Sequence, residues 1–112
     1  MKVMDKTTEI SKRLRRLNVD LINENDKARV VGFKSWFDED LAQTEVSVLW
    51  ELETPSKSGW PLERTDFVCQ RAFSALKDLD VANVYCAYRT FAEPADDDDK
   101  AYWPFPAIEQ AA

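Results

Sequence analysis

The chain has 112 residues, 45% of them hydrophobic and 32% charged, and 21 acidic against 15 basic side chains give a net charge of −6. This length suits one domain with a single packed core, and the acidity argues against a general attraction to nucleic acid. The chain has no histidine, which removes every catalytic or zinc-binding arrangement that needs an imidazole.

The first predicted element is a helix over residues 7–17. Ile10, Leu14 and Leu17 recur at the spacing of one helix face. Basic side chains occupy the opposite face: Lys12, Arg13, Arg15 and Arg16. Asparagine and aspartate become frequent from Asn18 onward, which predicts a stop there, although Leu21 would continue the apolar stripe if the helix ran on.

A β-hairpin is predicted next. Residues 43–53 alternate between apolar and polar side chains, as a half-buried strand does, and residues 28–37 are rich in valine and aromatic residues. Residues 38–41 suit the connecting loop. If Phe37 lies opposite Ala42, apolar residues meet apolar residues and Lys34 faces Glu45, so we expect that register.

A second helix is predicted from Pro61 to about Asp80, with an apolar stripe that includes Phe73 and Leu76. We expect both residues to be buried against Val46 and Val48. A third strand is predicted over residues 83–91. Placed beside the first strand, it gives a small α+β two-layer sandwich of order α-β-β-α-β, with a three-stranded antiparallel sheet and both helices on one face.

The composition changes after residue 91, so we divide the chain into a domain over residues 1–91 and an acidic, aromatic segment over residues 92–112. Four consecutive aspartates and two prolines beside Phe105 predict an irregular, extended path. Large aromatic residues next to acidic ones are a common composition of protein interfaces. The aromatic residues of this segment either pack back on the domain or contact a partner. In the second case the candidate partner-binding residues are Asp96, Asp97, Asp98, Asp99, Tyr102, Trp103 and Phe105.

The two cysteines, Cys69 and Cys86, are predicted to be reduced, buried and inert. Charged residues soon after Met1 predict no secretory signal, which favours a cytoplasmic location. The aspartate run lacks the alternate spacing and the glycine of a calcium loop. The chain also has no glycine-rich phosphate loop, so we expect no metal and no cofactor.

Two further patterns carry alternative functions. The polar side of the second strand holds Glu45, Glu51 and Glu53, which we expect to be a solvated outer face. A carboxylate pair there could serve as acid and base if an oligomer formed a pocket around it, and this is the enzymatic alternative. The basic face of the first helix carries a second alternative, nucleic-acid binding.

The function predicted from these features is non-enzymatic. The small size, the acidity and the missing catalytic constellation favour a binding module that acts as an inhibitor, immunity, adaptor or assembly protein. Opposite charges steer association, so the expected partner is a protein with a basic surface. The basic beginning and acidic end of the chain also allow two copies to pair.

Overall fold

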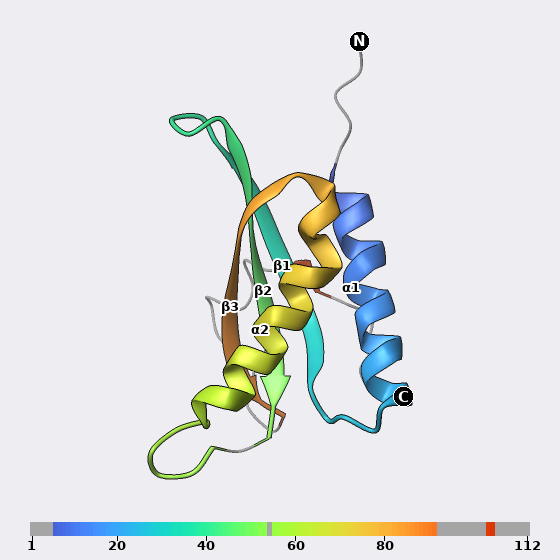
Figure 1. Ribbon diagram of the computed structural model, residues 1–112, viewed down its shortest axis with the longest axis vertical. Helices are drawn as coiled ribbons and strands as arrows, with labels where there is room; N and C mark the ends of the chain where they lie inside the picture. The colour runs from blue at the N-terminus through green and yellow to red at the C-terminus, as the bar shows by residue number, and fades with distance from the viewer. Residues whose placement is uncertain (1–5, 54, 92–102, 105–112) are drawn as a thin grey trace.

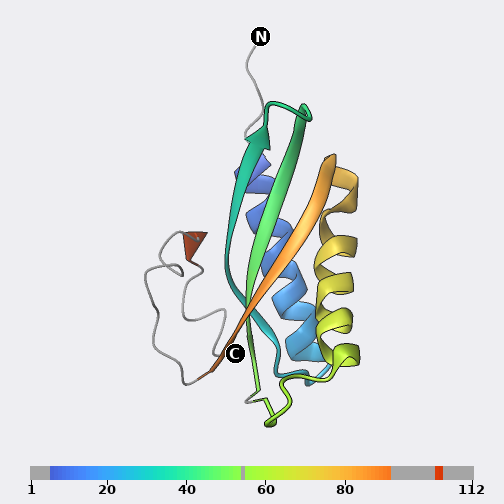
Figure 2. The same ribbon diagram turned by 90° about the vertical axis from the view of Figure 1, so that its left-hand side faces the viewer.

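The computed structural model describes residues 6–53, 55–91 and 103–104. Its elements, in chain order, are α1 (Lys6–Asn23), β1 (Arg29–Asp38), β2 (Gln43–Leu52), α2 (Leu62–Leu76), the 3-10 turn η1 (Lys77–Leu79), β3 (Val81–Thr90) and β4 (Trp103–Pro104). Both helices cover one face of the sheet (Figure 2). The predicted α+β class, the element order and the placement of the helices are confirmed.

The core lies between the helices and the sheet. Its side chains come from one stripe of each helix and from the alternate, helix-facing positions of the strands. Those from α1 and β2 are Ile10, Leu14, Leu17, Leu21, Val46, Val48, Trp50 and Leu52. The predicted stripe of α1 and the predicted core-facing residues of β2 are confirmed by this burial. The opposite face of β2 is not solvated as predicted, because Glu45, Ser47 and Leu49 are also buried.

The predicted end of the first helix is wrong. α1 continues past Asn18 because that amide is buried and bonds to β1 instead of its own helix backbone. Its Nδ2 donates to the Val30 carbonyl and its Oδ1 accepts from the Val30 N–H, both at 2.8 Å. The helix ends where Asn25 adopts a left-handed φ of 60°, which lets the Asp26 N–H donate to the Leu21 carbonyl at 2.9 Å.

The predicted hairpin is present, but its register differs from the predicted one. Phe37 faces Thr44 rather than Ala42, so the partner of Trp36 is Glu45 and that of Lys34 is Ser47. At the other end of the hairpin, a bulge between Val30 and Gly32 shifts the register by one residue. The bulge keeps Val30 on the core side of the sheet.

The sheet order is β3-β2-β1-β4, and β3 runs parallel to β2. The expectation of a wholly antiparallel sheet with the third strand beside the first was therefore wrong. α2 acts as a crossover connection that returns the chain to the edge of β2 in the same direction (Figure 1). The other edge of β1 pairs with β4, in which Trp103 faces Phe33, so two residues of the segment expected to be irregular form a strand.

Phe73 is not a core residue, contrary to the prediction. Its exposure is 48%, whereas Val68, Ala72 and Leu76 are fully buried. The buried face of α2 is therefore centred on Ala72. Phe73 is the next residue, and one residue turns the helix by about 100°. The Phe73 ring therefore lies at the flank of the helix, outside the layer between helix and sheet.

Candidate protein-binding site at the hairpin tip

The tip of the β1–β2 hairpin extends beyond the helices that cover the rest of it (Figures 1 and 2). Burial along β1 follows this geometry: the strand is buried from Arg29 to Phe33, whereas Trp36 and Phe37 are exposed. The tip is therefore a surface formed by strand residues with no helix packed against them.

Asp38 closes the loop at this tip. Its Oδ1 accepts the backbone N–H groups of Asp40 at 3.0 Å and Leu41 at 3.2 Å, which starts the turn at Asp38. Ala42 completes the turn with a left-handed φ of 53°. The short aspartate side chain thus fixes the register of the hairpin, which explains why strand alternation alone placed it two positions away.

Below the tip, Glu45 receives three side-chain hydrogen bonds on the sheet face opposite the helices. Trp36 donates through Nε1 at 3.2 Å, Asn83 through Nδ2 at 2.9 Å and Tyr85 through its hydroxyl at 2.9 Å. Glu45 is only 7% exposed. The expected solvated face is therefore wrong at this position, because aromatic and amide side chains from β1 and β3 enclose the carboxylate.

This arrangement orients two aromatic rings on the same face. The rings of Trp36 and Tyr85 are nearly parallel, with an angle of 9° and centroids 6.2 Å apart. The hydrogen bond to Glu45, together with partial burial, raises the pKa of the Tyr85 hydroxyl above its ordinary value. Glu45 therefore holds the surface beside the hairpin tip in one arrangement.

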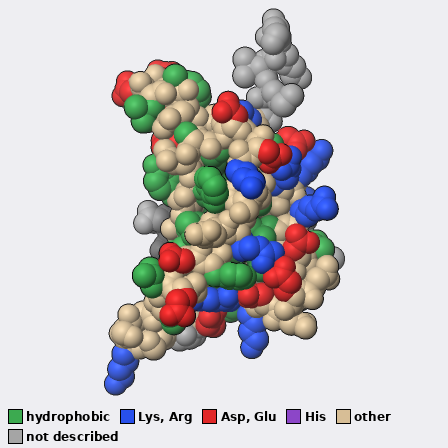
Figure 3. Space-filling model, viewed as in Figure 1, with side chains coloured by type: hydrophobic (Ala, Val, Ile, Leu, Met, Phe, Trp, Pro, Cys, Tyr) green, Lys and Arg blue, Asp and Glu red, His purple; other side chains and the backbone are tan. Residues whose placement is uncertain are grey.

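The tip combines exposed apolar and acidic groups. Phe37 is 60% exposed and Leu41 is 62% exposed. The three residues between them are all acidic: Asp38, Glu39 and Asp40. Figure 3 shows red and green side chains together on this projection, at the upper left. The hairpin tip thus has the same kind of composition that predicted a binding surface at the C-terminal segment.

The C-terminal residues predicted as the partner-binding site are placed only in part. The backbone of Trp103 pairs with Phe33 as part of β4. The other predicted residues, Asp96, Asp97, Asp98, Asp99, Tyr102 and Phe105, lie outside the described residues. Their role stays a prediction.

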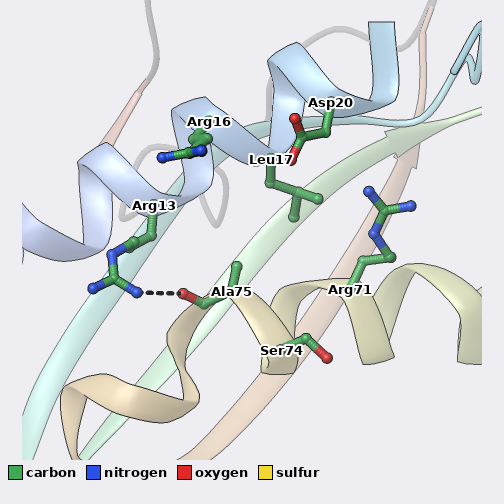
Figure 4. Close-up of a pocket in the computed structure, with 7 residues that line it drawn as sticks. All are labelled: Arg13, Arg16, Leu17, Asp20, Arg71, Ser74 and Ala75. Carbon is green, nitrogen blue, oxygen red and sulfur yellow. Dashed lines mark hydrogen bonds between the residues drawn. The ribbon is translucent and has the colours of Figure 1, made fainter. Parts of the chain in front are cut away.

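A groove of about 470 Å³ separates α1 from α2 on the outer side of the molecule. Figure 4 shows its lining, which comprises Arg13, Arg16, Leu17, Asp20, Arg71, Ser74 and Ala75. Arg13 donates across the groove to the Ala75 carbonyl at 3.5 Å and pairs with Asp78 at 2.5 Å. The groove includes part of the basic helix face that suggested nucleic-acid binding.

The charges around this groove balance. Arg71 forms two 2.8 Å hydrogen bonds to the carboxylate of Glu24, and this contact lowers the pKa of Glu24. The groove thus has three guanidinium groups and three carboxylates. The guanidinium groups belong to Arg13, Arg16 and Arg71, and the carboxylates are Asp20 in the groove and Asp78 and Glu24 at its ends. A balanced groove offers a polyanion little net attraction, so it does not favour the nucleic-acid alternative.

The remaining carboxylates of the predicted outer face are engaged by arginines. Glu51 is half-buried and lies 3.6 Å from Arg89, and the exposed Glu53 lies 3.0 Å from Arg64. Across residues 6–53, 55–91 and 103–104, no group of three His, Cys, Asp or Glu side chains is arranged to hold a metal ion. These contacts give Glu51 and Glu53 structural partners.

The two thiols lie side by side between α2 and β3. Both are free and half-buried, less enclosed than predicted. Burial, followed by the neighbouring Cys69 thiol, raises the pKa of Cys86 to about 12. Cys86 therefore stays protonated at neutral pH, where a thiol is a weak nucleophile.

Comparison with known proteins finds no match to this chain among family models, curated proteins or solved structures. In the described part of the chain, no helix is long and apolar enough to cross a membrane.

Proposed function

We propose that this protein is a non-enzymatic binding module that docks its hairpin tip on a protein partner with a basic surface. The observation that carries the proposal is the exposure of Phe37 and Leu41 on either side of an acidic loop. Full burial of one such side chain is worth about 1.5–3 kcal/mol, so the tip gains free energy from any partner with a matching apolar pocket.

The acidic loop supplies selectivity for a basic partner. Glu39 and Asp40 repel acidic surfaces and attract basic ones. Because opposite charges accelerate encounter, these two residues steer the tip toward a basic protein surface. The Glu45 hydrogen bonds to Trp36 and Tyr85 hold the neighbouring surface before binding, which lowers the entropy lost on association.

Site-specific cross-linking tests the proposal and identifies the partner. A photoreactive phenylalanine analogue in place of Phe37 should give one dominant protein adduct in an extract of the source cells. The same analogue in place of Val19, which is 54% exposed on α1, is the matched control and should not give that adduct.

The captured protein is then purified and titrated by calorimetry. Phe37→Ser and Leu41→Ser should each weaken its binding at least tenfold, which is about 1.4 kcal/mol, while Val19→Ser leaves it unchanged. Replacing Glu39 and Asp40 by their amides should reduce the dependence of affinity on salt. Equal affinity of wild type and Phe37→Ser would reject the hairpin tip as the docking surface.

The C-terminal segment is tested in the same titration. The prediction that Asp96–Asp99 and the following aromatic residues bind the partner requires that deleting residues 96–112 also weakens binding. An unchanged affinity after this deletion, together with a loss in Phe37→Ser, assigns the interface to the hairpin alone.

A further inference from the structure

The outer edge of β3 is a long strand edge. In the described ranges, β2 is the only strand that pairs with β3, which lies at the end of the sheet order. The strand is ten residues long, and three of its side chains, Ala82, Asn83 and Tyr85, are exposed. An unpaired strand edge presents backbone N–H and C=O groups that can bond to another strand.

This edge lacks the features by which proteins prevent strand pairing. Residues 81–88 contain no charged residue and no proline, and Arg89 is the only charged residue of β3. Monomeric proteins usually protect such edges with lysine, proline or a very short strand. The sequence of β3 therefore permits pairing with a further strand.

A row of α2 residues that ends in the exposed Phe73 flanks the edge on the helix side. Thr65 of α2 accepts a hydrogen bond from Tyr88 at 3.4 Å, and Cys69, one turn later, lies beside Cys86. Phe73 follows Cys69 by one more helical turn, and Val84 precedes Cys86 by two residues on the same face of β3. Phe73 therefore lies at the level of Val84. The exposed Phe73 ring thus borders the edge on one side of the sheet, as the exposed Tyr85 does on the other.

We propose that the β3 edge binds a second copy of this chain, with the two β3 strands antiparallel about a two-fold axis near Tyr85. Such an axis pairs each strand edge with itself and joins the two sheets into one. It also brings the two Phe73 flanks toward each other, because Val84 lies one residue from the axis.

The uncharged part of the β3 edge does not oppose contact between two copies. Each chain carries a net charge of −6, so two copies repel one another in general. Residues 81–88 are uncharged, so this part of the edge adds no like-charge repulsion between two acidic molecules. Added salt should therefore strengthen the dimer, whereas it weakens the charge-steered docking of the hairpin tip.

Analytical ultracentrifugation of the full chain tests the dimer, from about 1 µM to 1 mM protein and at about 50 and 500 mM salt. We expect a monomer–dimer equilibrium that tightens with salt. Phe73→Lys and Ala82→Lys should weaken it at least tenfold. The control Val19→Lys makes the same change of charge at an exposed α1 position and should dimerise as the wild type does.

Hydrogen exchange of the wild-type chain supplies a second measurement that needs no variant. The dimer requires amides within residues 82–88 to gain protection as the concentration rises through the dissociation constant. A wild type that is monomeric throughout, or Lys variants that dimerise normally, would overturn the proposal. Phe37→Ser should leave the dimer intact, so its outcome separates the dimer from the proposed function.

Discussion

Phe33 and Phe37 lie on the same strand, one near the base of the hairpin and one at its tip. Phe33 is 1% exposed and faces Val48, whereas Phe37 is 60% exposed and faces Thr44. The residue type is identical, so the difference comes from the helices, which cover only the base of the hairpin (Figure 2). An apolar side chain at the base stabilises the fold, and the same side chain at the tip remains available for a partner.

The largest effect expected from this comparison is the loss of Phe33. Phe33→Ala removes a ring from the packed base and should lower the free energy of unfolding by about 3–5 kcal/mol. Phe37→Ala should change it by no more than about 0.5 kcal/mol, because the ring is mostly solvated. Denaturant unfolding of the two variants measures both values, and similar losses would contradict the division into base and tip.

Asn18 provides the next test of the base. Asn18→Ala leaves the buried N–H and C=O of Val30 without their present partners and should cost about 2–3 kcal/mol. Asn23→Ala, at the exposed end of the same helix, is the control and should cost less than about 0.5 kcal/mol. Fast hydrogen exchange of the Val30 amide in Asn18→Ala would identify the lost bond as the cause.

The sequence predicted the elements that bury one face and failed where pairing depends on single side chains. The period of apolar residues in α1 and β2 directly reports which face meets the core. The hairpin register depends on Asp38 hydrogen bonds and on a bulge beside Val30, which no alternation encodes. The order of strands depends on which sheet edge α2 reaches, and local propensity says nothing about that.

The candidate site was harder to predict than the fold. The alternation along β1 predicts that Phe33 and Phe37 are equally buried. They differ in burial only because the helix layer covers Phe33 and does not reach Phe37. Glu45 looked like one of several solvated carboxylates because its donors come from two other strands. One signal was present: aromatic residues directly before an acidic loop, which marks an interface composition at residues 36–40.

A smaller, pH-dependent effect is expected from Arg64 of α2, which forms an ion pair with the loop that precedes β1. Its Nη2 lies 2.7 Å from Asp26, and its Nε lies 3.0 Å from Glu53. The hydrogen bond from Arg64 holds the pKa of Asp26 below its ordinary value. The resulting stability is complete above the unfolded pKa of about 3.9 and is lost as the pH falls through the lower folded pKa.

Arg64→Gln should therefore cost about 1–2 kcal/mol at pH 7, a value reduced by the partial exposure of the network. The difference from wild type should shrink once the pH falls below about 4. Lys57→Gln removes the same charge from an exposed loop and is the control. Unfolding curves at several pH values measure this, and a cost that stays constant down to pH 2 would show that Asp26 is not the relevant partner.

The smallest effect concerns the tip itself and has the opposite sign. Ala42 adopts a φ of 53°, a conformation that costs an alanine about 1–2 kcal/mol relative to its preferred regions and costs glycine little. Glycine loses more entropy on folding, so the net gain for Ala42→Gly should be about 0.5 kcal/mol. Ala82→Gly, on a strand without a positive φ, should instead lose about 0.5–1 kcal/mol. Chemical denaturation of both variants compares the signs, and a loss of stability in Ala42→Gly would show that the tip carries no backbone strain. A gain would mean that the tip, unlike the base, is not optimised for stability.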